Sequence, residues 1–276
     1  MCTYTVSEIC RIQKVSRQAY YQHEQREVHK EYEEAIVIEM VQAIRKRQTR
    51  IGVRKLYYKL APEFRKMGNQ IGRDQLFTLL KREGLLVSGK RRVCRTTNSN
   101  HWYAVYTNMI SDLVVERRNQ VWVSDITYLR TEQGFEYLSL ITDLYSRMIM
   151  GYCVSLSLSI EGSVQALRMA QRNAGELKGI IHHSDRGIQY CSYEYTGILK
   201  KAEMLISMGE KGNPYENAVA ERVNGILKSE FSLDETMRDH EEAKNLTGES
   251  IEIYNTERPH MSLNYRTPFE VYWGQV

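Results

Sequence analysis

The sequence predicts a mixed α/β sheet flanked by helices, preceded by a small all-α domain. Three observations lead to this prediction. From residue 120 onward, strand-like and helix-like segments follow one another in the order βββ-α-β-α-β-α. Before residue 88, every periodic segment has helical spacing. Finally, residues 1–100 carry 21 Lys and Arg against 10 Asp and Glu, whereas residues 101–276 carry 17 against 24. This asymmetry favours a nucleic-acid-binding part joined to something else, although a solvated basic surface explains the charge equally well.

The N-terminal residues 5–23 are expected to form two short helices around a turn at Lys14–Val15, with Ser16 as the N-cap of the second. Two interpretations fit them, the end of a helix-turn-helix or a simple helical arm.

Three further helices are predicted before residue 88. Apolar residues at helical spacing mark residues 28–47 and the segment after Gly52, and a turn is expected at Pro62–Asn69. The third helix covers residues 73–83, where Gly84 ends it. Its exposed side chains would be Arg73, Gln75, Lys81 and Arg82. The pattern is compatible with a helix-turn-helix that binds DNA and with an ordinary three-helix bundle.

Residues 88–100, rich in Ser, Thr, Asn and basic residues, form the best candidate for a linker. A short basic run within it could lie along DNA phosphates, or it could be only a solvated tether. Its members are Lys90, Arg91, Arg92 and Arg95.

Residues 120–155 are expected to form three antiparallel strands joined by short connections. A helix follows at residues 160–173, and the apolar strand GIIHH ends at Ser184–Asp185. A helix at 193–202, the short strand LISM, a strong helix at 216–231 and a last helix near 238–254 complete the pattern.

Three carboxylates stand out in this part of the chain. Asp125 lies in the middle of an apolar strand, where a charge is costly unless it is compensated. Asp185 closes a buried strand, and Glu221 follows it with 35 residues between them. On the helical wheel Glu221 shares a polar stripe with Asn217, Asn224 and Lys228, opposite an apolar stripe.

Close carboxylates repel one another, and hard divalent cations such as Mg²⁺ relieve that repulsion. Two such ions about 3.5–4 Å apart can stabilise a phosphodiester displacement. A zinc site at His182 and His183 is disfavoured because no third nitrogen or sulfur ligand has suitable spacing. Taken one at a time, each carboxylate could instead be an ordinary strand, turn or helix residue.

The composition limits the cellular compartment in which we expect the protein. The five cysteines are scattered and form no C-x-x-C pair, which argues against a disulfide framework and a zinc ribbon. We see no secretory signal and no apolar run long enough to span a membrane. A reducing cytoplasm is the simplest expectation.

Four ordered blocks of the chain resemble the downstream-frame (OrfB-type) transposases of bacterial insertion sequences, which carry a retroviral-integrase-type core. The blocks are WVSDITYL, HHSDRGIQY, GNPYENAVAERVNGILKSE and YNTERPHMSLNYRTPFEVY. Upstream, residues 44–86 resemble the helix-turn-helix-like segment that precedes this core.

The resemblance implies a ribonuclease-H-like fold and a DDE site formed by Asp125, Asp185 and Glu221. These residues would hold two Mg²⁺ ions, with Mn²⁺ able to substitute, and Asp125 would bridge the ions. The implied reaction is cleavage at the element's ends to free a 3′-hydroxyl, followed by attack of that hydroxyl on a phosphodiester.

The resemblance also assigns supporting roles. Residues expected to contact DNA are Arg186, Asn217, Lys228 and Arg258, in addition to Arg73 and the basic run. Residues expected to support the carboxylates from behind are His183, Asn224 and His260. A solvated side chain remains an alternative for Lys228, and a packing role remains one for Arg258 and His260.

We therefore expect a helical arm at residues 1–27, a helix-turn-helix-like domain at 28–87 and a basic linker at 88–115. A catalytic core at 116–232 and a C-terminal helix and tail at 233–276 complete the organisation. The expected partners are double-stranded DNA at element ends and target, further copies of the chain, and the upstream-frame product, as a fusion or as a separate protein. We expect a bacterial cytoplasmic, nucleoid-associated protein. Two alternatives remain, a ribonuclease-H-like nuclease that cuts without joining and a DNA-binding regulator derived from a truncated transposase.

Overall fold

The computed structural model describes residues 5–68, 71–87, 105–209 and 218–274. The chain divides into two compact units, one made of residues 1–47 and 51–87 and the other of residues 48–50 and 88–276. Each unit has hydrophobic clusters of its own.

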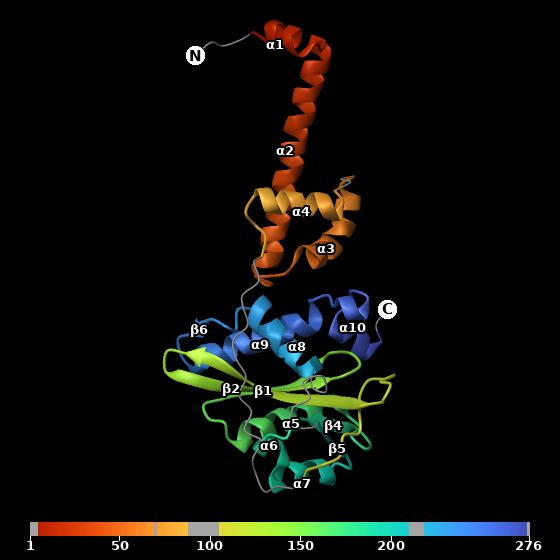
Figure 1. Ribbon diagram of the computed structural model, residues 1–276, viewed down its shortest axis with the longest axis vertical. Coiled ribbons are helices and arrows are strands. Elements are labelled where there is room, and N and C mark those ends of the chain that lie inside the picture. The colour runs from red at the N-terminus through yellow and green to blue at the C-terminus, as the bar shows by residue number, and fades with distance from the viewer. Residues whose placement is uncertain (1–4, 69–70, 88–104, 210–217, 275–276) are drawn as a thin grey trace. The chain divides into compact units, whose positions relative to one another are not determined.

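The first unit is entirely helical (Figure 1). Its helices are α1 (Val6–Gln13), α2 (Arg17–Arg45), α3 (Val53–Lys66) and α4 (Arg73–Arg82). Ser16 caps α2 as predicted, accepting a hydrogen bond from the Ala19 amide at 3.1 Å. Gly84 follows α4 with a φ of +66°, the left-handed conformation that suits a glycine after a helix.

Two expectations for this unit were wrong. The helices predicted at 16–23 and 28–47 form one continuous helix, α2, because the exposed segment between them contains no Gly or Pro that would end it. Surface ion pairs such as His29–Glu33 at 3.3 Å run along it. The turn expected at Pro62–Asn69 begins later, because α3 continues through Pro62 to Lys66. The buried ring of Phe64 packs the last turn of α3 into the core and offsets the cost of the proline.

The second unit is built on a mixed sheet. Its strands are β1 (Val121–Thr131), β2 (Gly134–Asp143), β3 (Ile149–Ser155), β4 (Ile181–Ser184), β5 (Leu205–Met208) and β6 (Thr236–Met237). The order is β3-β2-β1-β4-β5, with β6 pairing the far end of β1. The first three strands are antiparallel, whereas β4, β5 and β6 pair in parallel. The predicted strand sequence is therefore confirmed.

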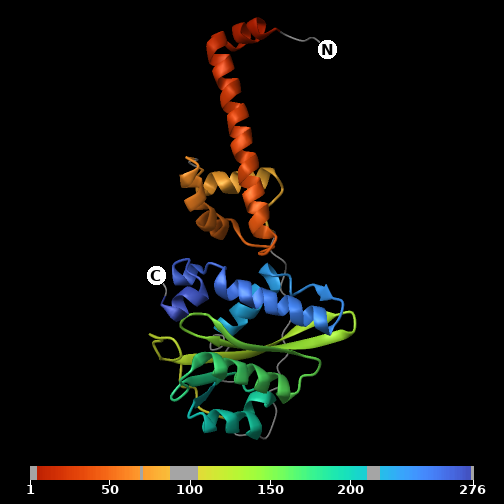
Figure 2. The same ribbon diagram turned by 180° about the vertical axis from the view of Figure 1, so that it is seen from behind.

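Helices cover both faces of this sheet (Figures 1 and 2). One face carries α5 (Ile160–Ala174), α6 (Ile188–Cys191) and α7 (Tyr193–Lys201), and the other carries α8 (Ala218–Glu230), α9 (His240–Thr256) and α10 (Pro268–Trp273). The short helix α6, the strand β6, the 3₁₀ turn at Met261–Leu263 and α10 were not expected from the sequence.

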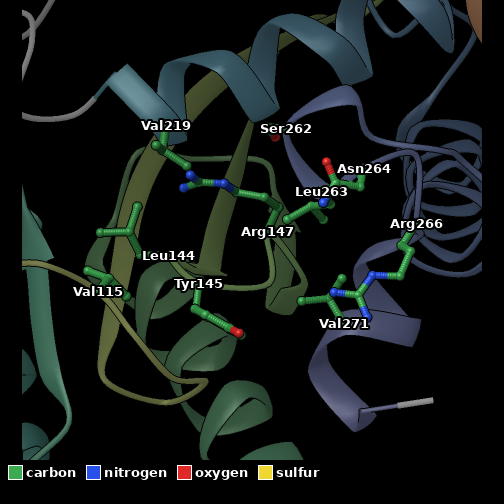
Figure 3. A pocket seen from close by; sticks show the side chains of 10 residues that line it. All are labelled: Val115, Leu144, Tyr145, Arg147, Val219, Ser262, Leu263, Asn264, Arg266 and Val271. Carbon is green, nitrogen blue, oxygen red and sulfur yellow. The ribbon is translucent and has the colours of Figure 1, made fainter. Parts of the chain in front are cut away.

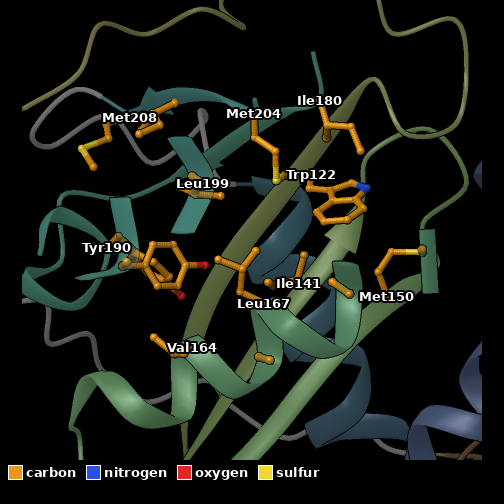
Figure 4. Close-up of a cluster of buried hydrophobic side chains, with 14 of the residues drawn as sticks. Trp122, Ile141, Met150, Val164, Leu167, Ile180, Tyr190, Leu199, Met204 and Met208 are labelled. Carbon is orange, nitrogen blue, oxygen red and sulfur yellow. The ribbon is translucent and has the colours of Figure 1, made fainter. Parts of the chain in front are cut away.

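Two hydrophobic clusters hold these layers together. On the α5 and α7 side, Trp122 is fully buried among Ile141, Met150 and Leu167 (Figure 4). On the other side, Val223, Ile226 and Leu227 of α8 pack against Leu129 and Leu140 of the sheet, together with α9. Because successive side chains of a strand alternate between faces, Asp125 lies on the same face as Leu129, the face covered by α8.

Candidate active site

The pairing of β1 with β4 places Asp125 and Asp185 side by side. Ser124 is opposite Ser184 in this parallel pair, so the next residue on each strand is an aspartate. The Asp185 carboxylate is held by the Gly187 amide, which donates a hydrogen bond to Oδ1 at 2.9 Å. A Cβ on Gly187 would lie 2.9 Å from the same Oδ1, so a larger residue in the turn after β4 would displace this carboxylate.

Glu221 lies in the first turn of α8, the helix that covers this face of the sheet, and is exposed. One turn further, Asn224 is buried and donates a hydrogen bond from Nδ2 to Asp125 Oδ2 at 2.7 Å. This bond brings Asn224 of the polar stripe against β1, and the expected role of Asn224 in supporting the carboxylates remains a prediction. Lys228, on the same stripe, is partly buried.

The three carboxyl groups influence one another electrostatically. Burial and the neighbouring Asp185 raise the pKa of Asp125 to about 7, with a smaller contribution in the same direction from Glu221. Hydrogen bonds from Asn224 and from the Ile126 amide, which donates to Oδ1 at 3.0 Å, act in the opposite direction. The pKa of Lys228 is lowered by burial, although Asp125 works against this shift. The site therefore disfavours the charged form of Asp125 unless further positive charge is supplied.

The donor set suits a hard divalent cation. All three candidate ligands are carboxylates, the oxygen donors that Mg²⁺ prefers. Within the described residues, however, no group of three His, Cys, Asp or Glu side chains is gathered closely enough to hold a metal ion.

A buried polar network that the sequence did not reveal lies beneath the site. His182 Nε2 is 2.7 Å from Ser124 Oγ and 2.9 Å from the hydroxyl of Tyr195. Burial lowers the pKa of His182 to about 3, so its imidazole is neutral and serves as a structural link between β1, β4 and α7. The pair of adjacent histidines in a strand was the available signal, since their side chains must point to opposite faces.

His183 therefore lies on the face that carries Asp125. It is fully buried, and its Nδ1 is 2.9 Å from Ser207 Oγ of β5, which also accepts a hydrogen bond from the Met109 amide. These contacts join β4 to β5 just before Asp185. Support of the carboxylates by His183 remains a prediction.

The side chains expected to contact DNA lie in different settings. Arg186 is half-buried, and its Nε donates to the Gly209 carbonyl at 2.8 Å. Arg73, at the start of α4, is exposed and forms an ion pair with Asp74. The side chains of Gln75, Lys81 and Arg82 are also exposed. Lys90, Arg91, Arg92, Arg95 and Asn217 lie outside the described residues. The DNA contacts of all these residues remain predictions.

Arg258 requires a correction. Its side chain is 3% exposed and forms a two-point ion pair with Glu230, with Nε–Oε2 and Nη2–Oε1 distances of 2.9 and 2.8 Å. A guanidinium that is buried and already engaged by a carboxylate is not placed to contact a phosphate, which argues against the expected DNA contact. The ion pair with Glu230 instead favours the packing role that the sequence also allowed for Arg258.

Other residues of the YNTERPH segment also make packing contacts and hydrogen bonds within the fold. The Tyr254 hydroxyl donates to the Arg147 carbonyl at 3.1 Å, and the Asn255 amide group makes two 3.0 Å hydrogen bonds with the backbone of Ile149. The His260 ring is buried and stacks edge-on against Tyr254, with ring centroids 4.9 Å apart. The contacts of the His260 ring therefore place it in the C-terminal packing, and its expected support of the carboxylates remains a prediction.

Comparison with known proteins identifies the family. The integrase core domain matches residues 115–214, and a second integrase core model matches residues 202–268. The chain is 34% identical over 219 residues to the transposase of insertion sequence element IS629 from Shigella sonnei, covering 79% of this chain and 72% of that protein. The chain belongs to the insertion-sequence transposases with an integrase core domain.

Two further relatives span most of the chain. An uncharacterised 31 kDa protein of insertion element IS600 from Shigella sonnei is 38% identical over 266 residues, covering 94% of this chain and 96% of the relative. The transposase InsF of insertion sequence IS3A from Escherichia coli (strain K12) is 30% identical over 232 residues, covering 82% and 79%. Among solved structures, the intasome of simian T-cell lymphotropic virus in complex with the PP2A regulatory subunit B56 gamma matches with 16% identity and a TM-score of 0.49, covering 81% of this chain and 71% of that chain.

The mixed sheet of this transposase is the ribonuclease-H-like fold expected from the resemblance. In the described ranges, no helix is both long and apolar enough to cross a membrane.

Proposed function

We propose that this transposase cleaves DNA at the ends of its insertion sequence and joins the freed 3′-hydroxyl ends to target DNA, with Asp125, Asp185 and Glu221 as the catalytic residues. The observation that carries the proposal is the parallel register of β1 and β4. It sets two aspartates from sequence segments 60 residues apart on neighbouring strands, under the α8 face that bears Glu221.

These carboxylates would hold two Mg²⁺ ions, with Mn²⁺ as a substitute, and Asp125 would bind both. When bound there, the ions would activate the attacking oxygen and stabilise charge on the leaving oxygen. The electrostatics support this assignment, because the charged form of Asp125 lacks compensation and a divalent cation would supply it.

The chain's own residues would orient the reactants. The Asn224 amide fixes one oxygen of Asp125, and the Gly187 amide fixes one oxygen of Asp185. Both carboxylates would therefore present their remaining lone pairs in a set direction, which reduces the reorganisation needed during the reaction. Lys228 on the same helix face would bind a DNA phosphate beside the carboxylates.

Double-stranded DNA would be bound with additional contributions from Arg73 on α4, from Arg186 and Asn217, and from the basic run at residues 90–95. The protein would act as a homo-oligomer that pairs two element ends, alone or with the upstream-frame product, at the nucleoid of the bacterial cytoplasm.

The test is a strand-transfer assay on labelled duplexes that carry the inverted repeats flanking the gene, with Mg²⁺ or Mn²⁺. Cleaved and joined products are expected from the parent chain and from the Asp112→Asn variant, a matched change of an exposed aspartate. Asp185→Asn should remove both products. Cleavage without joining would favour a nuclease, and tight binding without chemistry at any metal concentration would favour a regulator.

A further inference from the structure

A cavity of about 510 Å³ lies between α8 and the C-terminal loop of the second unit (Figure 3). Its walls come from segments far apart in the sequence: the loop before β1, the β2–β3 turn, the start of α8, the loop before α10, and α10 itself. The lining residues are Val115, Leu144, Tyr145, Arg147, Val219, Ser262, Leu263, Asn264, Arg266 and Val271.

The C-terminal motif, the YNTERPHMSLNYRTPFEVY block, supplies part of the pocket lining and contacts that hold it. Tyr254 bonds to the backbone of the β2–β3 turn at Arg147, and Arg258 ties the loop to α8 through Glu230. The turn itself is anchored by the buried Asp143, which accepts hydrogen bonds from the Ser146 amide and hydroxyl at 2.8 and 2.6 Å. The pocket walls are therefore held rigidly before any ligand arrives.

Two lining residues of the pocket and one neighbour of the lining have a left-handed backbone. Arg147, Asn264 and Tyr265 have φ values of +65°, +54° and +64°. Asparagine adopts this left-handed conformation readily, but arginine and tyrosine do so at a cost. Strain of this kind persists where the surrounding structure enforces it, and it is often found at binding sites.

The charge of the pocket points to an anionic ligand. Arg147 reaches across it toward Val219, and Arg147 Nη1 is buried without a hydrogen-bond partner among the described residues (Figure 3). Arg266 adds a second guanidinium, and no acidic side chain is among the ten lining residues. This is unexpected in a part of the chain where Asp and Glu outnumber Lys and Arg, 24 to 17 over residues 101–276.

The remaining lining is suited to a nucleotide. Val115, Leu144 and Leu263 offer apolar walls, and Tyr145 offers an aromatic ring, the surface on which unpaired bases stack. Guanidinium groups pair well with phosphate oxygens. The pocket lies at the start of α8, where Val219 precedes Glu221 by two residues. Because residues two apart on a helix point to opposite sides, the pocket and the proposed active site lie on opposite sides of the same helical turn.

We propose that this pocket receives one unstacked nucleotide of the DNA strand that flanks the scissile phosphodiester. Arg147 and Arg266 bind its phosphate, and Tyr145 and the apolar wall hold its base. The proposal rests on the proposed function for the identity of the DNA, but not on the chemistry of the carboxylates. It gives the C-terminal motif a role in holding the substrate strand near the site of cleavage.

The test uses the full chain with Asp185→Asn, so that the duplex is bound but not cut. 2-Aminopurine is placed in turn at each position around the cleavage site of an element-end duplex, since its fluorescence rises when the base leaves the stack. We expect a rise confined to one or two adjacent positions. Arg147→Gln, Arg266→Gln and Tyr145→Ala, each added to this background, should return that position to the duplex level.

Each arginine variant should also weaken duplex binding about tenfold, as expected for the loss of one charge-assisted hydrogen bond. Arg172→Gln, an exposed arginine of α5 on the opposite side of the sheet, is the matched control and should change neither reading. Arg266 is exposed, so its variant tests the pocket even if Arg147→Gln perturbs the turn.

The proposal is wrong if the bound duplex shows no brightened position, if brightening survives both arginine substitutions, or if the chain does not bind element-end DNA. It is also wrong if a polyglutamate peptide binds in an Arg147-dependent manner while no position brightens, because the pocket would then be a peptide site. Strand transfer by the parent chain is measured separately on the same duplex. Chemistry without brightening refutes the pocket alone, and brightening without chemistry refutes the proposed function alone.

Discussion

The two sides of the first turn of α8 differ in charge. On one side, Glu221 belongs to the proposed active site, where burial and the neighbouring Asp185 raise the pKa of Asp125. On the other side, Val219 lines a pocket with two arginines and no acidic residue among its lining. Compensation is partial on both sides, from Lys228 near Asp125 and from the buried Asp143 near Arg147, so the first side would take a further cation and the second a further anion. A metal-bound DNA strand that passes the start of α8 would supply both.

Two arginines of the second unit, the buried Arg258 and the half-buried Arg147, sharpen this comparison. Arg258 is matched by Glu230 at 2.8 and 2.9 Å, whereas the buried Nη1 of Arg147 has no hydrogen-bond partner in the described part of the chain. The first arrangement stabilises the fold, and the second leaves a binding group available. Burial alone therefore does not distinguish a structural arginine from one that binds a ligand; the hydrogen-bond partners do.

The largest expected effect is that of Asp125→Asn. Strand transfer should fall by roughly 10⁴–10⁶-fold, as when one member of a catalytic set is removed. The fold should not suffer, because Asn224 can turn its amide so that its Oδ1, now buried without a partner, accepts from the new Asn side chain. Product formation on gels and thermal unfolding of the same preparation measure the two effects.

The difference in folding stability between the parent and Asp125→Asn should depend on pH, because only the parent has the Asp125 carboxyl group. The pKa of Asp125 is raised from 3.8 to about 7, so the folded parent loses stability as pH rises from about 4 to about 7, and the loss is complete above 7. In EDTA, Asp125→Asn should therefore be more stable than the parent at pH 8, by about 4 kcal/mol for a rise of about three pKa units, and close to it at pH 4. A variant less stable than the parent at pH 8 would contradict the assigned electrostatics.

Breaking the structural ion pair should act on the fold. Glu230→Ala leaves the buried Arg258 guanidinium without its carboxylate, which should cost about 3–5 kcal/mol of unfolding free energy. Glu252→Ala, an exposed glutamate of α9, is the control and should change stability little. Chemical denaturation measures both. An equal, small cost for the two variants would mean that the Arg258–Glu230 ion pair does not stabilise the fold.

Asn224→Ala should have an intermediate effect on activity. It leaves the three carboxylates in place but removes the hydrogen bond that orients Asp125, so strand transfer should fall about 10–100-fold with a raised Mg²⁺ requirement. Asn224→Gln, which retains an amide, is expected to recover part of the activity. A loss of activity that no Mg²⁺ concentration reduces would argue against an orienting role.

The smallest expected effect concerns the linker. Arg91→Ala with Arg92→Ala should weaken DNA binding and reduce the slope of log affinity against log salt by about one unit for each lost phosphate contact. Arg172→Ala serves as the control. Filter binding or fluorescence anisotropy across a salt series provides the slope. If the slope is unchanged, the linker does not touch phosphate.

Much of the catalytic unit was predictable because strands and helices in this chain carry clear periodic patterns. The succession of strands and helices along the chain and the separation of α8 into a polar and an apolar stripe follow from residue periodicity, whereas the contact of Asn224 with β1 required the structure. The continuous α2 was missed because its exposed middle has no apolar periodicity, and a helix can persist there without any. The late turn after α3 was missed because burial of Phe64 outweighs the local effect of Pro62.

The sequence by itself indicated the family and the three carboxylates that we propose as catalytic, since these stand in spaced, recognisable blocks. Only the tertiary structure decided how the other polar residues are used. Arg258 pairs with Glu230, His182 links buried strands, and Arg147 meets Asn264 and Arg266 across a cavity. The reason is physical: a charged side chain's role depends on which partners the fold brings within hydrogen-bond distance, and those partners are distant in sequence.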